Sequence, residues 1–187
     1  MRRIWTVLAV AGLMTAATAF AHPDAEFAST KPVASETKTE FARNLDYAGD
    51  KLIQLAEAMP ADKYSWRPAE GVRSFGEALL HAAGGNFMIP SFTGAKMPDG
   101  FDPKTFETST TEKEEIVAQL KKSLEHVKAV ANAISDSDMD TSVKWFMGEG
   151  SKREILFFTA AHNHEHLGQL IAYARMNGVT PPWSKKE

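Results

Sequence analysis

The stretch His162-Asn163-His164-Glu165-His166-Leu167-Gly168-Gln169 lies inside a long helical pattern that covers about residues 151–177. His162 and His166 are spaced i,i+4, so both imidazoles project from one face of the helix, about one turn apart. This is the spacing of a helical metal clamp, in which two neutral imidazole nitrogens take adjacent corners of a tetrahedron. His164 points about 200° away from His162. The alternative is a polar helix face that carries histidine by chance. Two histidines are too few for a metal site, so a site would need further ligands from elsewhere in the chain.

Three more helical patterns precede this one. The first covers about residues 35–59, with a stripe formed by Phe41, Leu45, Ala48, Leu52, Leu55 and Ala56. The second begins at Ser74-Phe75-Gly76-Glu77, a capping box, and ends near Phe87 or Met88. The third covers about residues 111–134. The final helix ends at Asn177-Gly178, a favourable C-cap pair.

Four long amphipathic helices predict an all-α protein built as a four-helix bundle. No convincing strand accompanies them, and the run 143–147 reads at most as a short extended piece. The connection formed by residues 89–109 is far longer than a tight antiparallel turn needs. We therefore expect a long crossover between the second and third helices, which would run parallel, while the third and fourth run antiparallel.

The N-terminus has the pattern of a secretory signal peptide. A basic start, Met1-Arg2-Arg3, is followed by an apolar stretch and by Ala19-Phe20-Ala21, a small-x-small cleavage site. We expect cleavage after Ala21 and a periplasmic or secreted protein, with an uncleaved N-terminal anchor as the alternative. The chain then divides into residues 1–21 as signal peptide, 22–34 as flexible leader and 35–187 as the bundle domain.

Composition excludes several classes of site and partner. The 187 residues contain no cysteine, which removes disulfides, thiolate ligands and a cysteine nucleophile. The formal net charge is −3, and loss of Arg2 and Arg3 with the signal peptide makes it −5. No basic stripe remains, so we expect neither nucleic acid nor membrane as a partner after cleavage. A homodimer stays open, and the expected partner is a small-molecule substrate of unknown identity.

His81 is the best candidate for a third ligand. It lies in the second helix close to Gly84 and Gly85, and each glycine inside a helix costs about 1 kcal/mol relative to alanine. Such a cost makes sense where a backbone, a metal or a ligand must approach closely. The alternative is a core histidine bonded to a carbonyl group. His22 lies in the leader, and His126 falls off the apolar stripe of its helix, which predicts a surface histidine.

Three motifs carry a family resemblance that covers about residues 35–183. They are Tyr64-x-Trp66-x-Pro68 with the following Ser74–His81 segment, the segment from His162 to Arg175, and the terminal Gly178-x-x-Pro181-Pro182. With these motifs the chain resembles the DinB-like superfamily of YfiT-type metalloenzymes.

The resemblance implies a four-helix bundle with a crossover between its second and third helices. It also implies one divalent transition metal ion, zinc or nickel in relatives, held by one histidine of the second helix and two of the fourth. By position these ligands are His81, His162 and His166.

Three neutral imidazoles would leave the metal an open position for water or substrate. We therefore expect a metal-dependent hydrolase. One alternative is a thiol-dependent transferase, a reaction found in the resembled superfamily, although thiol cofactors are scarce outside the inner membrane. The other is a non-catalytic periplasmic metal-binding or stress protein. Whether the chain is an enzyme stays open at this stage, and no residue is assigned as catalytic.

Four further residues are candidates for positions around the metal or in its pocket. Gln169 could bond a ligand histidine, or else fix helix packing. Tyr173 lies on the same face and Trp66 could line the pocket, although packing is the simpler role for both. Glu77 lies one turn before His81 but is more simply explained as the capping-box partner. Other candidates for the pocket mouth, each of which could instead be core, are Phe87, Met88, Phe92, Trp145, Met147 and Trp183.

Overall fold

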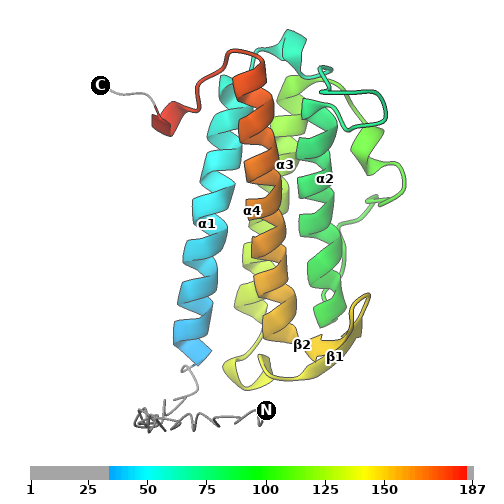
Figure 1. Ribbon diagram of the computed structural model, residues 1–187. Helices are drawn as coiled ribbons and strands as arrows, with labels where there is room; N and C mark the ends of the chain where they lie inside the picture. The colour runs from blue at the N-terminus through cyan, green and yellow to red at the C-terminus, as the bar shows by residue number, and fades with distance from the viewer. Residues whose placement is uncertain (1–33, 185–187) are drawn as a thin grey trace, which may run out of the picture. The chain divides into compact units, whose positions relative to one another are not determined.

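The computed structural model describes residues 34–184, and the predicted signal peptide and most of the leader lie outside this range. Four long helices form a bundle (Figure 1). Their bounds are α1 Ala34–Ala58, α2 Phe75–Met88, α3 Lys113–Ala133 and α4 Lys152–Met176. The sequence-based bounds agree with these to within two residues. No helix within residues 34–184 is both long and apolar enough to cross a membrane.

The core lies between the four helices and contains the predicted stripes. All six stripe residues of α1 are buried, and they pack against apolar side chains of α2, α3 and α4. Burial of each large aliphatic or aromatic side chain contributes about 1.5–3 kcal/mol. The fully buried large side chains include Phe41, Leu45, Leu52, Leu55, Phe75, Leu79, Ile116, Leu120 and Ile155.

The predicted capping box defines the start of α2. The Ser74 side chain accepts a hydrogen bond from the Glu77 backbone N–H at 3.2 Å, and the Ser74 N–H donates to Glu77 Oε2 at 2.7 Å. Two backbone donors that the first turn would leave unpaired are satisfied in this way. The cap fixes where α2 begins, and therefore which of its faces meets α4.

The connection between α2 and α3 is a crossover, as predicted. Gly76 at the start of α2 lies against Ile116 at the start of α3, and Asn86 near the end of α2 bonds Ser123 further along α3. These contacts advance in the same direction, so α2 and α3 run parallel (Figure 1). Helix α4 begins near the end of α3, where the Lys152 N–H donates to Thr141 O, and runs antiparallel to it.

A small hairpin corrects the expectation that the chain has no strand. Strand β1, Ser142–Trp145, pairs antiparallel with β2, Gly148–Ser151, at the foot of the bundle. Trp145 is buried against Ile89 and Ile155 and anchors the hairpin to α4. Gly148 has a φ of 116°, a conformation that side-chain-bearing residues rarely adopt. Strands of four residues are too short for an alternation of apolar and polar residues to be recognised in the sequence.

Candidate metal centre

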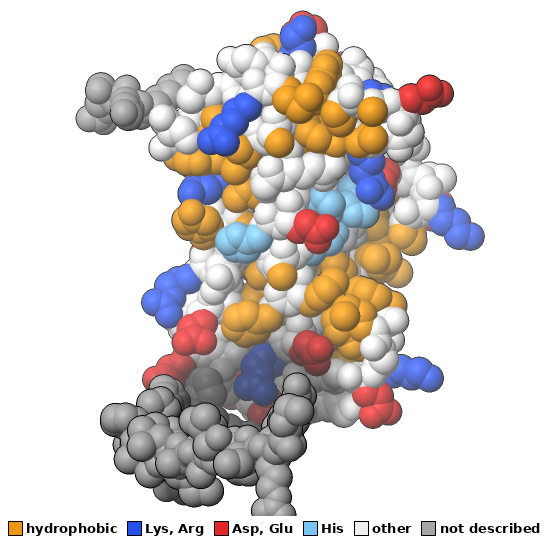
Figure 2. All heavy atoms as spheres, viewed as in Figure 1, with side chains coloured by type: hydrophobic (Ala, Val, Ile, Leu, Met, Phe, Trp, Pro, Cys, Tyr) orange, Lys and Arg blue, Asp and Glu red, His pale blue; other side chains and the backbone are white. Residues whose placement is uncertain are grey.

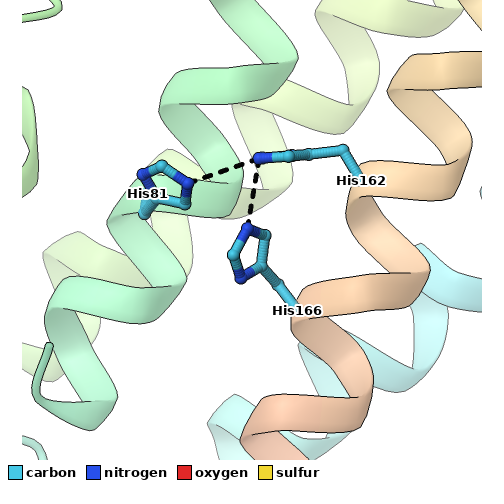
Figure 3. A group of neighbouring side chains, drawn as sticks. All are labelled: His81, His162 and His166. Carbon is cyan, nitrogen blue, oxygen red and sulfur yellow. Dashed lines mark hydrogen bonds between the residues drawn. The ribbon is translucent and has the colours of Figure 1, made fainter. Parts of the chain in front are cut away.

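Three histidines from two helices of the bundle converge (Figure 3). His81 projects from α2, and His162 and His166 project from α4. The Nε2 atom of His162 lies 3.4 Å from that of His81 and 3.1 Å from that of His166. All three ligand atoms lie within 4.8 Å of one another. This is the only group of at least three such side chains within residues 34–184 that could hold a metal ion.

The nitrogen spacing fits a tetrahedral metal ion. With metal–nitrogen bonds of about 2.0–2.1 Å, two ligands at tetrahedral corners lie about 3.3 Å apart. The two shorter separations of 3.1 and 3.4 Å bracket that value. Two of the three nitrogen pairs thus have tetrahedral spacing, and His81 and His166, within 4.8 Å of each other, complete a set of three donors of the kind that zinc and similar metals bind.

The partners of the outer ring nitrogens fix which nitrogen faces the centre. His81 Nδ1 contacts a carboxylate oxygen of Glu107, and His166 Nδ1 lies 2.9 Å from Gln169 Oε1. Both partners are hydrogen-bond acceptors, so each neutral ring carries its proton on Nδ1 and presents a bare Nε2 lone pair. Metal-bound histidines in proteins are oriented by this kind of outer hydrogen bond.

Burial keeps His162 and His166 neutral. Burial, together with the neighbouring His166 and His81, lowers the pKa of His162 to about 3. Burial also lowers the pKa of His166 below its ordinary value. Protons therefore compete weakly with a metal ion for these two nitrogens at neutral pH.

Gly85 makes room for the His162 ring, which explains the glycine pair in α2. A Cβ atom at position 85 would lie 2.7 Å from His162 Nδ1 and still closer to Cε1. At Gly84 a Cβ would lie 3.3 Å from the Phe106 ring. The predicted close approach is therefore confirmed, and the group that approaches Gly85 is an imidazole.

Glu107 is a residue of the site that the sequence did not single out. Besides contacting His81, its carboxylate accepts hydrogen bonds from Arg73 Nε at 2.7 Å and Arg73 Nη2 at 3.2 Å. Burial raises the pKa of Glu107, but the bonds from Arg73 and His81 outweigh it and hold the pKa below its ordinary value. The crossover thus delivers a carboxylate to the outer side of His81. Its position in an unusually long connection was the only feature of the sequence that could have pointed to Glu107 as a residue of the site.

The four residues predicted around the metal divide into two groups. Gln169 bonds His166 and also donates from Nε2 to the Tyr173 hydroxyl at 2.9 Å. The Tyr173 ring meets Trp66 edge-on, with centroids 5.5 Å apart. These three form a chain of contacts that begins at His166. Glu77 is placed in the capping box and pairs with Arg67 at 3.0 Å.

The other histidines lie apart from the cluster. His164 is exposed and stacks on Tyr47, with centroids 5.8 Å apart. His126 on α3 is half-buried, where the sequence predicted a surface position, because its ring packs edge-on against Phe87. His22 lies outside the described residues.

A buried amide pair next to the site joins three helices. Asn86 and Asn163 are fully buried neighbours of Gly85 and His162. Asn163 donates to Asn86 Oδ1 at 2.6 Å and to the Thr159 carbonyl at 2.8 Å, while Asn86 donates to Ser123 Oγ at 3.1 Å. Because buried polar groups are costly unless paired, this network favours one register of α2 against α4.

An apolar cavity of about 80 Å³ adjoins His81 and His162. Of the predicted mouth residues only Met88 lines it, and the aromatic lining comes from Phe101 and Phe106 of the crossover. Figure 2 shows histidine side chains at the surface between two groups of hydrophobic side chains. His81 and His162 are partly exposed, so the cluster can be reached from solvent, and it borders an apolar recess.

Comparison with known proteins identifies the family. The sequence profile of the DinB superfamily matches residues 44–170, more than half of the chain. This chain belongs to the DinB superfamily. The resemblance drawn from the histidine helix and the capped second helix is confirmed. No curated protein matches the chain.

Solved structures of DinB-like proteins share the fold. One from Bacillus cereus superposes with a TM-score of 0.65 at 20% identity, covering 77% of this chain and 95% of that chain. Another from Bacillus subtilis has a TM-score of 0.60 at 20% identity, covering 75% and 93%. In this DinB-superfamily chain, the three-histidine cluster is compatible with metal binding.

Proposed function

We propose that this protein is an exported, metal-dependent hydrolase whose metal, zinc or nickel, is held by His81, His162 and His166. The observation that carries the proposal is the set of three converging Nε2 atoms, which no carboxylate joins within residues 34–184. Catalytic metal sites have three protein ligands and one open position, whereas structural sites are closed by four.

A metal ion with an open position lowers the pKa of bound water toward neutrality, which supplies a nucleophile at neutral pH. Neighbouring residues of the chain hold the ligand histidines in the tautomer that binds a metal. Glu107 and Gln169 keep the protons of His81 and His166 on the outer nitrogens. Arg73 engages Glu107 from the other side, so this carboxylate is not free to act as a base.

The recess beside the histidines favours a substrate with a small apolar group next to the bond that is cleaved. Its walls include Met88, Ile89, Phe101 and Phe106. These side chains exclude water from one side of the site, which strengthens electrostatic interactions there. An ester or amide of a short apolar acyl group fits this combination of recess and metal.

Cobalt substitution tests the open position. We expect the visible spectrum of the cobalt protein to change on addition of azide, and the metal-loaded protein to hydrolyse a member of a small panel of activated esters and amides. The His162→Ala variant should show neither effect, and His126→Ala should show both. A cobalt spectrum that ignores azide would overturn the proposal and favour a structural metal. A response to small thiols without hydrolysis would favour the thiol-dependent transferase.

Export is the second part of the proposal and is supported by the basic start, apolar run and Ala19-Phe20-Ala21 of residues 1–21. N-terminal sequencing of protein from the periplasm or medium should give a chain that begins at His22. A soluble cytoplasmic protein that begins at Met1 would contradict it.

A further inference from the structure

Two apolar side chains form the turn of the β1–β2 hairpin. The strands pair at Trp145 and Gly148, so the turn consists of the two residues between them, Phe146 and Met147. Their side chains are 56% and 63% exposed. Two-residue hairpin turns favour Asn, Asp and Gly. Turn geometry therefore does not explain Phe146 and Met147, whereas an apolar ligand at this surface would.

Phe146 belongs to a larger apolar surface. Its ring lies edge-on to Phe92 of the short 3₁₀ helix η2, Ile89–Thr93, and to Phe158 of α4, with centroids 5.6 Å apart in both pairs. Phe92 and Phe158 are partly exposed. We call Phe92, Phe146, Met147 and Phe158 the hairpin patch. Figure 2 shows hydrophobic side chains gathered between the surface histidines and the foot of the bundle, where Figure 1 places the hairpin. Apolar residues gathered in this way mark binding surfaces, whereas isolated ones are ordinary.

The hairpin patch reaches the metal centre along α4. Phe158 lies one turn before His162, so the two side chains are neighbours on one helix face, about 5–6 Å apart at Cβ. Met88 lines the recess beside the histidines and packs, like Phe158, against the small apolar core that anchors the hairpin. From His162 to Phe146 the path adds this turn to the 5.6 Å between the Phe158 and Phe146 rings, about 11 Å in all. That distance is comparable to the length of an extended octyl chain.

We propose that the hairpin patch binds an unbranched aliphatic chain of the substrate while the reacting group lies at the metal. The inference rests on the proposed function, in which the recess holds a short acyl group, and it assigns the chain to the other side of the cleaved bond. The substrate class is then an ester or amide that joins a short acyl group to a long-chain alcohol or amine. The patch offers neither charge nor a strong hydrogen-bonding group, which favours an aliphatic chain over a sugar or a peptide.

Binding of N-alkyl acetohydroxamates to the cobalt protein, from N-methyl to N-octyl, tests the patch without requiring hydrolysis. The hydroxamate oxygens bind the metal, the acetyl group fills the recess, and only the alkyl chain varies. Complete burial of a methylene strengthens binding about fourfold, so burial of one side should give about twofold for each methylene. The whole series should therefore strengthen binding about 100-fold, measured by titration of the cobalt spectrum.

Phe146→Ser removes the outer part of the patch and should reduce the gain along the series to about tenfold. Met147→Ser keeps the ring contacts and should lower the gain at least about threefold, so it serves the same purpose if Phe146→Ser does not fold. Tyr47→Ser and Met176→Ser are matched controls, because these side chains are 56% and 63% exposed but lie on α1 and at the end of α4. Both controls should keep the full gain.

Equal binding of the N-methyl and N-octyl compounds by the wild type would overturn the proposal. So would the full gain in both Phe146→Ser and Met147→Ser, which would place the chain elsewhere. A wild-type dimer that Phe146→Ser converts to a monomer, together with binding that ignores chain length, would show instead that the patch joins two copies of the chain.

Alkyl acetates from methyl to octyl separate this inference from the proposed function. Hydrolysis without any preference for chain length would contradict the role of the patch and leave the hydrolase standing. Hydroxamate binding that strengthens with chain length, without hydrolysis of any ester or amide, would contradict the hydrolase and support the patch.

Discussion

Replacing Gly85 by alanine should strongly weaken metal binding without weakening the metal-free fold. The added Cβ would lie 2.7 Å from His162 Nδ1, whereas ordinary contacts begin at 3.4 Å, so the ring must move by about 0.7 Å or more. Metal–ligand distances tolerate about 0.2 Å, and a site works only within about 0.5 Å of its productive geometry. The ring can rotate away in the metal-free protein, but it then ceases to be a ligand.

We expect the metal affinity of Gly85→Ala to fall at least about 100-fold. This is the upper end of the loss seen when a residue that hydrogen-bonds a metal ligand is mutated, and here the ligand itself is displaced. The free energy of unfolding of the metal-free variant should stay level or rise, because alanine is better than glycine inside a helix by about 1 kcal/mol. Competition with a chromophoric chelator measures the affinity, and thermal unfolding of the chelator-treated protein measures the stability.

Gly168→Ala is the matched control. This glycine lies in α4 two residues after His166, and a Cβ there would meet nothing within 4 Å. The variant should gain a similar helix stability and bind metal like the wild type. If Gly85→Ala binds metal within about threefold of Gly168→Ala, the placement of His162 against α2 is wrong.

Three further predictions concern individual side chains. Glu107→Gln should weaken metal binding about 10- to 100-fold in chelator competition, because His81 loses its carboxylate partner, whereas Glu149→Gln in the hairpin should not. Ser74→Ala removes the cap of α2 and should lower the free energy of unfolding by about 1 kcal/mol in urea titrations; an unchanged midpoint would contradict the cap's role. Burial lowers the pKa of His126 in the folded state. The contribution of the neutral ring to the free energy of unfolding is therefore fully present above pH 6.5, the ordinary pKa, and is lost as the pH falls through the lower pKa of the folded state. Below pH 6.5 the wild type should therefore lose stability more steeply than His126→Phe, and parallel pH profiles would refute this.

Local signals allowed the helices and two of the three histidines, His162 and His166, to be predicted. The capping box at Ser74 and the pair Asn177-Gly178 depend on neighbouring residues, so they mark helix ends without knowledge of the tertiary fold. The i,i+4 spacing of His162 and His166 likewise follows from helix geometry. His81 needed the family resemblance, because nothing local shows that α2 faces α4.

The parts that the sequence did not reveal depend on tertiary contacts. Glu107 lies in an irregular connection, and it reaches His81 only because the crossover passes that side of α2. Asn86 and Asn163 are 77 residues apart, and each looks like an ordinary polar residue until α2 and α4 pack together. Phe101 and Phe106 likewise line the recess because the crossover passes that side of α2. Helical periodicity carries no information about the path of such an irregular connection.

Metal stoichiometry in single histidine variants tests the central claim most directly. After loading with zinc or nickel and removal of excess metal, elemental analysis of the wild type should give one ion per chain. His126→Ala should retain that ion, because it lies outside the cluster, whereas His81→Ala, His162→Ala and His166→Ala should each lose it. Full occupancy in His166→Ala, or loss of the ion in His126→Ala, would contradict a centre built from His81, His162 and His166.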